Sequence, residues 1–163
     1  MNHAMLQRIV EEVAARLRRR ARSTATLSVA QLGEADIRSL LCQHASLRIV
    51  QVDLPLLEQL TGQRALTAAG CALHEAMAWG VRVQLTLLPT LLPALAVKKL
   101  ARLPLTFSDP PGQPVRLHAA SVLTYADVAR FSGGYLVLRR RPIITALARE
   151  AAVARHVQLI TQE

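Results

Sequence analysis

The stretch that decides the fold is LRIVQVDLPLLEQLTGQRALTAAGCALHEAMAWGVRVQLTL, residues 47–87. It opens with a short apolar and β-branched run, Leu47–Val52, which is typical of a strand. Asp53 is placed to cap a helix that follows this strand directly. A second helix is predicted over residues 66–79, and an alternating strand over residues 81–87. The order of strand, helices and strand indicates a layered α/β domain with a mainly parallel sheet.

The same alternation of strands and helices continues on both sides of this stretch. The two strands around the turn SDPPGQ, residues 108–113, predict a hairpin that adds an antiparallel portion to the sheet. Thr124 followed by Asp127 is a capping-box variant that starts a helix. We expect strands over residues 24–29, 47–52, 81–87, 104–107, 114–118, 135–140 and 157–160, and helices over residues 34–45, 53–60, 66–79, 94–101, 124–131 and 145–156.

The first segment, residues 1–22, predicts a long amphipathic helix. Five aliphatic residues recur at helical spacing and form one narrow line, here called the aliphatic stripe: Leu6, Ile9, Val10, Val13 and Leu17. Asn2 is placed to cap the helix, and Glu12 with Arg16 forms a favourable i,i+4 pair. From Arg8 to Arg22 there are six Arg and two Glu, a net charge of +4. We therefore expect a basic helix over residues 1–22 followed by one α/β domain over residues 23–163.

The residues of this helix leave three interpretations of its role open. It packs on its own domain, it lies on an anionic membrane, or it docks into a groove on another protein. Glu11 and Glu12 interrupt the polar face, and the helix has no aromatic anchors, which argues against the membrane.

The charge balance of the whole chain suggests nucleic acid, but the composition argues against it. The chain has 163 residues, a length that suits one domain, with 20 Lys and Arg against 11 Asp and Glu and a net charge of +9. Single-strand binders stack bases on aromatic side chains, and aromatics make up only 3% of this chain. We therefore expect no nucleic acid partner.

Several features indicate a soluble, cytoplasmic protein. The longest uncharged run, Val83–Val97, has 15 residues and contains two prolines, which is too short and too interrupted for a membrane span. Charged residues in the first segment exclude a signal peptide. Cys42 and Cys71 form no CxxC motif, and we expect both to be buried thiols.

A search for catalytic and cofactor motifs finds none. His74-Glu75 resembles the start of a zinc-protease helix, but Ala78 stands where the second histidine is needed. No phosphate-binding glycine loop, serine-hydrolase elbow or paired carboxylates are visible. We expect no enzyme, no metal and no cofactor, with a small cofactor- or nucleotide-binding α/β protein as the alternative.

Two positions carry weaker hypotheses. Arg139, Arg140 and Arg141 end a predicted strand just before the helix that starts at Thr145, which suggests an anion site, since ligands bind beyond strand ends and helix starts favour anions. The alternative is that these arginines leave the strand toward solvent. Asp53 is either a ribose or metal ligand or a plain helix cap, and caps are far more common.

The chain resembles the small M proteins of propanediol-utilisation bacterial microcompartments. The similar strings run from end to end: LQRIVEEVAARL (6–17), STATLSVAQL (23–32), SLRIVQVDLPLL (46–57), VKKLARLPLTFSD (97–109), YADVA (125–129), GGYLVLRRR (133–141), TALA (145–148) and VQLI (157–160). None of these is a general motif, so their joint occurrence in this order is specific.

The resemblance implies a non-catalytic structural or assembly component of a protein-shelled organelle for cobalamin-dependent 1,2-propanediol degradation. The implied partners are microcompartment shell proteins, encapsulated enzymes or both, within a microcompartment in the cytoplasm. The first helix also resembles the short targeting helices of packaged enzymes, although its run Arg18–Arg20 is more basic. This favours docking of the aliphatic stripe into a groove on a partner protein, linking interior enzymes to the shell.

Overall fold

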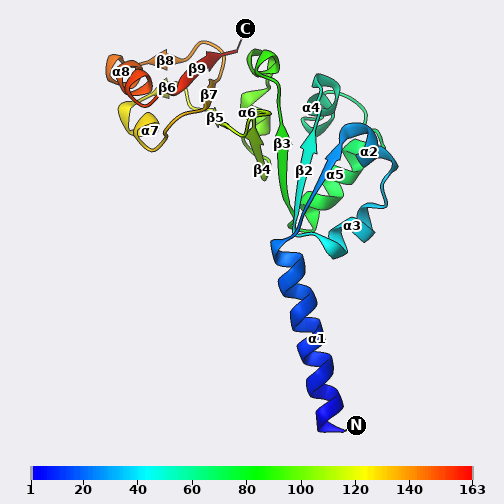
Figure 1. The fold of residues 1–163 in the computed structure, drawn as a ribbon. Helices are drawn as coiled ribbons and strands as arrows, with labels where there is room; N and C mark the ends of the chain where they lie inside the picture. Colours follow the sequence, from blue (N-terminus) through cyan, green and yellow to red (C-terminus); the bar gives the residue numbers. More distant parts are fainter. Residues whose placement is uncertain (1, 163) are drawn as a thin grey trace.

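A computed structural model describes residues 2–162 of the chain, so the end positions of the expected ranges 1–22 and 23–163 lie outside the described residues. A long N-terminal helix is followed by an α/β domain (Figure 1). The helices are α1 (His3–Arg22), α2 (Val29–Glu34), α3 (Ile37–Gln43), α4 (Leu54–Leu60), α5 (Ala68–Ala78), the 3₁₀ helix η1 (Pro89–Ala94), α6 (Val97–Leu100), α7 (Tyr125–Ala129) and α8 (Ala146–Ala154). The strands are β1 (Thr24–Ser28), β2 (Ser46–Val50), β3 (Arg82–Thr86), β4 (Leu105–Ser108), β5 (Pro114–His118), β6 (Val122–Leu123), β7 (Tyr135–Leu138), β8 (Ile143–Ile144) and β9 (Gln158–Thr161).

The main sheet has seven strands in the order β1-β2-β3-β4-β5-β7-β9. Strands β1 to β4 are parallel, β5 runs antiparallel to β4, and β5, β7 and β9 are again parallel to one another. Strands β6 and β8 form a separate parallel pair. The predicted α/β class with a mainly parallel, mixed sheet is therefore confirmed, and the SDPPGQ turn does join an antiparallel pair.

The strand order decides which face of the sheet each helix covers. Along the chain, each strand of the main sheet is added next to the previous one at the same growing edge. Crossovers between parallel strands are right-handed. Helices α2 to α5 therefore all lie on one face of β1–β4. The strand direction reverses at β5 while the sheet keeps growing the same way, so α7 and α8 fall on the opposite face. Figure 1 shows α7 and α8 set apart from α2, α4 and α5.

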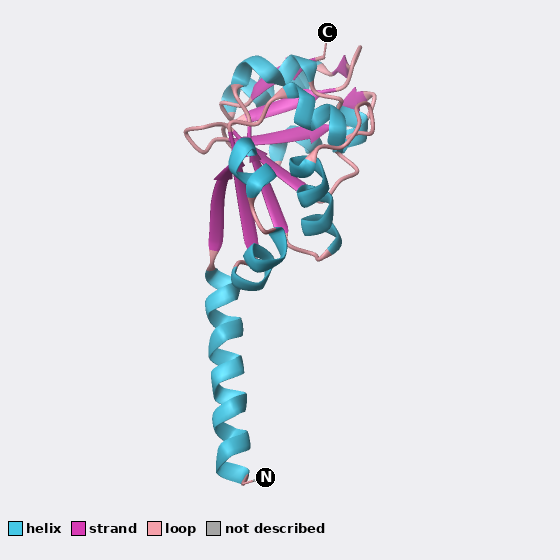
Figure 2. Ribbon diagram, turned by 90° about the vertical axis from the view of Figure 1, so that its right-hand side faces the viewer, coloured by secondary structure: helices cyan, strands magenta, loops and turns pink. Residues whose placement is uncertain are grey.

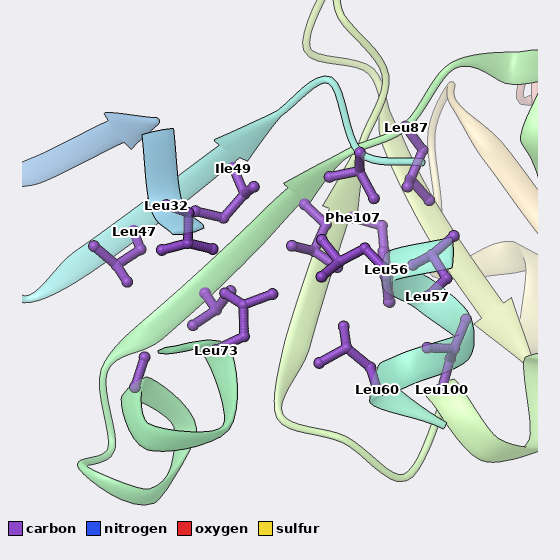
Figure 3. Close-up of a cluster of buried hydrophobic side chains, with 14 of the residues drawn as sticks. Leu32, Leu47, Ile49, Leu56, Leu57, Leu60, Leu73, Leu87, Leu100 and Phe107 are labelled. Carbon is purple, nitrogen blue, oxygen red and sulfur yellow. The ribbon is translucent and has the colours of Figure 1, made fainter. Parts of the chain in front are cut away.

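Two clusters of buried side chains correspond to these two faces. The larger cluster packs one face of β1–β4 against α2–α6, with Leu47 and Ile49 among its members (Figure 3). Both residues are fully buried, as is Leu85. The smaller cluster joins Leu136 and Leu138 of β7 to α7 and α8. Neighbouring residue Val137 belongs to the larger cluster, because successive strand residues point to opposite faces.

Three helix ends, at α4, α5 and α7, follow the chemistry that the sequence predicts. Asp53 caps α4, since its carboxylate accepts a hydrogen bond of 3.0 Å from the backbone N–H of Leu56. Gly80 ends α5 with a positive φ of 72°, the left-handed conformation that glycine adopts without strain. At α7 the Asp127 carboxylate accepts hydrogen bonds from the backbone N–H and the hydroxyl of Thr124, at 2.9 and 2.8 Å. The hydrogen bond from Leu56 to Asp53 confirms the interpretation of Asp53 as a helix cap.

Some short elements differ from the predictions. The helix expected over residues 34–45 is α3, and α2 precedes it with a reciprocal cap between Ser28 and Gln31. The helix expected over residues 94–101 is shortened to α6, because Pro89 and Pro93 hold the preceding turn in a 3₁₀ form. The strands β6 and β8 have only two residues each, which is too short for a periodic pattern that would predict them.

The prediction of buried thiols is wrong, because Cys42 and Cys71 are both exposed. Each lies beside a buried residue on its helix, Leu41 on α3 and Ala72 on α5, and so points outward. In the described part of the chain, no helix combines the length and the apolar character that a membrane crossing requires.

Candidate partner-docking site

Helix α1 is formed by local sequence rather than by packing. The backbone N–H groups of Met5 and Leu6 donate to the carbonyl oxygen of Asn2, which occupies the cap position. The Asn2 side chain makes no capping hydrogen bond, so the expected side-chain cap is wrong. Arg16 and Glu12 form the predicted ion pair at 2.8 Å. Arginines in the last turn match the negative end of the helix dipole.

The aliphatic stripe lies in solvent along this helix. No residue of α1 is buried, and Figures 1 and 2 show α1 projecting from the domain as a single rod. The exposed fractions of the stripe residues run from 44% at Leu6 to 59% at Leu17. The interpretation that α1 packs on its own domain is therefore wrong. The stripe is an apolar face without a partner among the described residues.

The base of α1 is tied to the domain at three points. The backbone N–H of Ala45 donates to the carbonyl oxygen of Arg20 at 3.1 Å. The Nε–H of Arg20 donates to the carbonyl oxygen of Leu41 at 2.8 Å. The hydroxyl of Ser23 and Nδ1 of His44 share a hydrogen bond of 2.6 Å. These bonds connect the base of α1 to the last turn of α3 and to the loop between α3 and β2, so the helix leaves the domain in a defined direction.

The predicted anion site is only partly assembled. Arg139, Arg140 and Arg141 follow β7. The backbone N–H of Arg139 donates to the carbonyl oxygen of His118, and that of Arg140 donates to the side-chain oxygen of Gln162. Strand β8 separates them in sequence from Thr145.

The Thr145 hydroxyl is already engaged at the start of α8. It accepts from the backbone N–H of Ala148 and donates to the carbonyl oxygen of Leu123, both at 3.2 Å. This hydroxyl therefore has no donor left for an anion, and anion binding by the three arginines stays a prediction.

A hollow that sequence reasoning missed lies at the carboxyl ends of β1–β4. It has a volume of about 760 Å³ and is lined by Arg48, Gln84, Ser108 and Asp53 together with apolar loop residues. The signal was present in the strands, where polar residues alternate with buried ones, as in Leu47, Arg48 and Ile49. Parallel strands covered on both faces are continuously apolar, so this alternation indicates an uncovered face.

Residues 2–162 contain no group of three or more His, Cys, Asp or Glu side chains placed to hold a metal ion.

Comparisons with known proteins agree with the resemblance in the sequence. The family model described as "Putative propanediol utilisation" matches residues 8–158. The bacterial microcompartment assembly protein PduM of Salmonella typhimurium is 59% identical over 163 residues, which is 100% of both chains. The protein of the same name from Citrobacter freundii is 55% identical over the same full length. Comparison with solved structures gives no significant match.

The expected microcompartment setting agrees with the names of these relatives, both of which describe assembly proteins rather than enzymes. With the family match over residues 8–158 and this identity over its whole length, the chain belongs to the propanediol-utilisation family of bacterial microcompartment assembly proteins PduM.

Proposed function

We propose that this protein is a non-catalytic assembly component of the bacterial microcompartment for 1,2-propanediol degradation, and that α1 attaches it to a partner protein. The observation that carries the proposal is the aliphatic stripe, which projects from the domain with every member exposed. A row of exposed aliphatic residues on a preformed helix is the usual form of a helix that docks into a groove. The relatives are named as assembly proteins, which supports the same role.

The favourable free energy of docking comes from burial of the aliphatic stripe. Burying five aliphatic side chains supplies several kcal/mol, at about 1.5–3 kcal/mol per side chain, before the costs of association. Because α1 is already helical and fixed at its base, less ordering is needed than for a disordered tail. The stripe is therefore the part of α1 that we expect to decide affinity.

The chemistry of the partner follows from the charges beside the stripe. Arg16 is paired with Glu12, whereas Arg8, Arg18 and Arg22 have no carboxylate within ion-pair distance among the described residues. An apolar groove with acidic rims would match both the stripe and these cations. We propose a shell protein or an encapsulated enzyme with such a groove, so that the protein links interior enzymes to the shell.

The second candidate is a small cofactor- or nucleotide-binding protein housed in the compartment. The hollow at the carboxyl ends of β1–β4 favours it, because α/β proteins commonly bind ligands at such strand ends. Nucleotides, flavins and cobalamins would each raise the melting temperature of the purified protein if they bound its folded state. A colourless protein whose melting temperature none of them moves would exclude this candidate.

The attachment is tested with two matched proteins in cells that make the compartments. Residues 1–22 fused to a fluorescent reporter should form foci, and the full chain without those residues should be lost from purified compartments. Diffuse reporter fluorescence, unchanged when the shell is absent, would argue against docking by α1. Full recovery of the shortened chain with the compartments would instead place the attachment in the α/β domain.

A further inference from the structure

One face of β1–β4 carries no helix among residues 2–162. Helices α2 to α5 cover the face that holds Leu47 and Val83, and α7 and α8 cover the other face beside β7 and β9. We call the uncovered surface the open face and define it by the cross-strand row of Thr26, Arg48, Gln84 and Thr106, which the strand register aligns. Because parallel sheets are normally covered on both faces, an open one is a surface without its usual cover.

The open face is hollowed rather than flat. The hollow of about 760 Å³ at the carboxyl ends of the strands continues toward their amino ends as a second hollow of about 360 Å³. The two share Arg48 and Gln84 as lining residues. The first also presents the apolar side chains of Val50, Leu54 and Leu88. Together they form a trough along the strands, polar and basic at one end and partly apolar at the other.

The charge at the amino end of the trough is uncompensated. Neither Arg48 nor Arg82 has a carboxylate within ion-pair distance in the described part of the chain. The nearest polar partner of Arg48 is Gln84, whose Oε1 lies 3.4 Å from its Nε. The amide of Gln84 is itself fixed by a 2.9 Å hydrogen bond to the Ser108 hydroxyl. The guanidinium of Arg48 is therefore held over the hollow and free to meet an anion.

The basic end of the trough adjoins the base of α1. The backbone N–H of Arg82 donates to the carbonyl of Ala45, whose own N–H donates to the carbonyl of Arg20. The arginines of the last helical turn therefore lie at the same edge of the sheet as Arg82. Arg82 therefore lies at the amino end of the trough, beside the base of α1, while Asp53 and Asp109 line the far end.

We propose that the open face binds an acidic segment of a partner protein, with glutamate or aspartate on Arg48 and Arg82 and aliphatic residues in the hollow beside Val50 and Leu88. Charge complementarity selects this occupant. A second copy of the chain would bring like charges together on this face. Nucleic acid lacks aromatic stacking partners here, because none of the residues that line either hollow is aromatic. The surface is separate from the aliphatic stripe and does not depend on its function.

The proposal is tested by fluorescence anisotropy with the full chain and a labelled peptide of glutamates and leucines, Glu-Leu-Glu-Glu-Leu-Glu-Glu-Leu. Saturable binding that weakens as salt rises is expected. The combined change of Arg48→Glu and Arg82→Glu should raise the Kd by about tenfold or more. Arg149→Glu on α8, which changes an exposed arginine that has no ion pair with residues 2–162, should leave the Kd within about twofold.

Two further measurements distinguish peptide binding at the open face from peptide binding at α1. In NMR spectra of the isotope-labelled chain, the peptide should shift the amide signals of Thr26, Gln84 and Thr106. The substitution Val13→Glu on α1 should leave the affinity for the peptide unchanged. The proposal is overturned by no saturable binding at low salt, by equal binding of a peptide with lysine in place of glutamate, or by shifts confined to α1. Tighter binding of a single-stranded oligonucleotide, or self-association lost in Arg48→Glu, would also overturn it.

Discussion

The Nε–H of Arg20 donates a hydrogen bond of 2.8 Å to the carbonyl oxygen of Leu41, a residue that is fully buried. The bond joins residues that are 21 positions apart in the chain, and it reaches from the end of α1 to the end of α3. Since the rest of α1 projects into solvent, this contact and the adjacent backbone bond to Ala45 set the direction of the helix. The position of the aliphatic stripe relative to the domain therefore depends largely on two bonds of Arg20, beside the bond between Ser23 and His44.

Arg20→Ala should loosen the base of α1 without unfolding the domain. The loss of one hydrogen bond to a charged donor should cost about 1.5–3 kcal/mol if the freed carbonyl stays buried, and less if water replaces the donor. Hydrogen exchange should become faster at residues 20–23 and 44–45. Arg18→Ala, which removes an exposed arginine from the same turn, serves as the control. Equal exchange in both variants would contradict the anchoring role of Arg20.

Gln59 and Gly70 should be coupled in stability. The buried Gln59 Oε1 accepts hydrogen bonds from the backbone N–H and the hydroxyl of Thr67, at 3.0 and 2.8 Å. A Cβ added at Gly70 would overlap this same oxygen. Gly70→Ala should therefore destabilise the protein by about 1–3 kcal/mol, and by clearly less in a Gln59→Ala background. Urea unfolding of the four proteins measures the coupling, and simple additivity would show that the two residues do not act together.

Gly134→Ala should be among the most damaging substitutions in the second half of the chain. Gly134 has a φ of 80°, and a Cβ there would overlap the backbone carbonyl oxygen of Pro114 on the neighbouring strand β5. We expect a loss of about 2–4 kcal/mol, since backbone yields less than a side chain. Gly133→Ala is the matched control, with a φ of 70° but only a side-chain atom nearby at 3.4 Å. Equal losses in thermal unfolding would show that φ alone matters.

Asp127 should make the stability of the second half depend on pH. Hydrogen bonds from the backbone N–H and the hydroxyl of Thr124 hold the pKa of Asp127 below its ordinary value of 3.8, with smaller contributions from His118 and Arg130. Because the folded pKa is lowered, the stabilisation is complete above the ordinary value and is lost as the pH falls through the lowered one.

The stability difference between the wild type and Asp127→Asn should therefore be largest near neutral pH and shrink in acid. Thr124→Ala should cost about 1 kcal/mol at neutral pH through loss of the cap. Urea unfolding of the three proteins across the acid range checks both statements. A difference that is constant with pH would mean that the Asp127 charge does not contribute.

Elements defined by local chemistry could be predicted from the sequence. The strand Leu47–Val52, the cap at Asp53 and the end of α5 at Gly80 each depend on neighbouring residues, and each is confirmed with small shifts of its ends. Helix α2 was missed because it has only six residues, although the reciprocal cap of Ser28 and Gln31 was visible in the sequence.

The candidate sites were harder to predict, because they depend on which surfaces stay uncovered. The stripe of α1 could be recognised by its spacing, but an amphipathic helix usually packs on its own domain, and only the structure shows that Leu6 and Leu17 remain exposed. The alternation in β2 indicates an uncovered face, but the residues that meet on that face depend on the strand order, which local patterns do not determine. Arg48 and Gln84 are far apart in the chain and meet only because β2 and β3 are neighbours.

We propose that the aliphatic stripe attaches the protein to the microcompartment. The most direct measurement is the fraction of the full chain that co-purifies with microcompartments when it carries Val10→Glu and Val13→Glu, compared with Ala4→Glu as an exposed control on the same helix. Because both valines are exposed, the unfolding free energy should change by no more than about 0.5 kcal/mol. We predict that the double variant is released while Ala4→Glu stays bound. Retention of the double variant at the wild-type fraction would show that the stripe does not attach the protein.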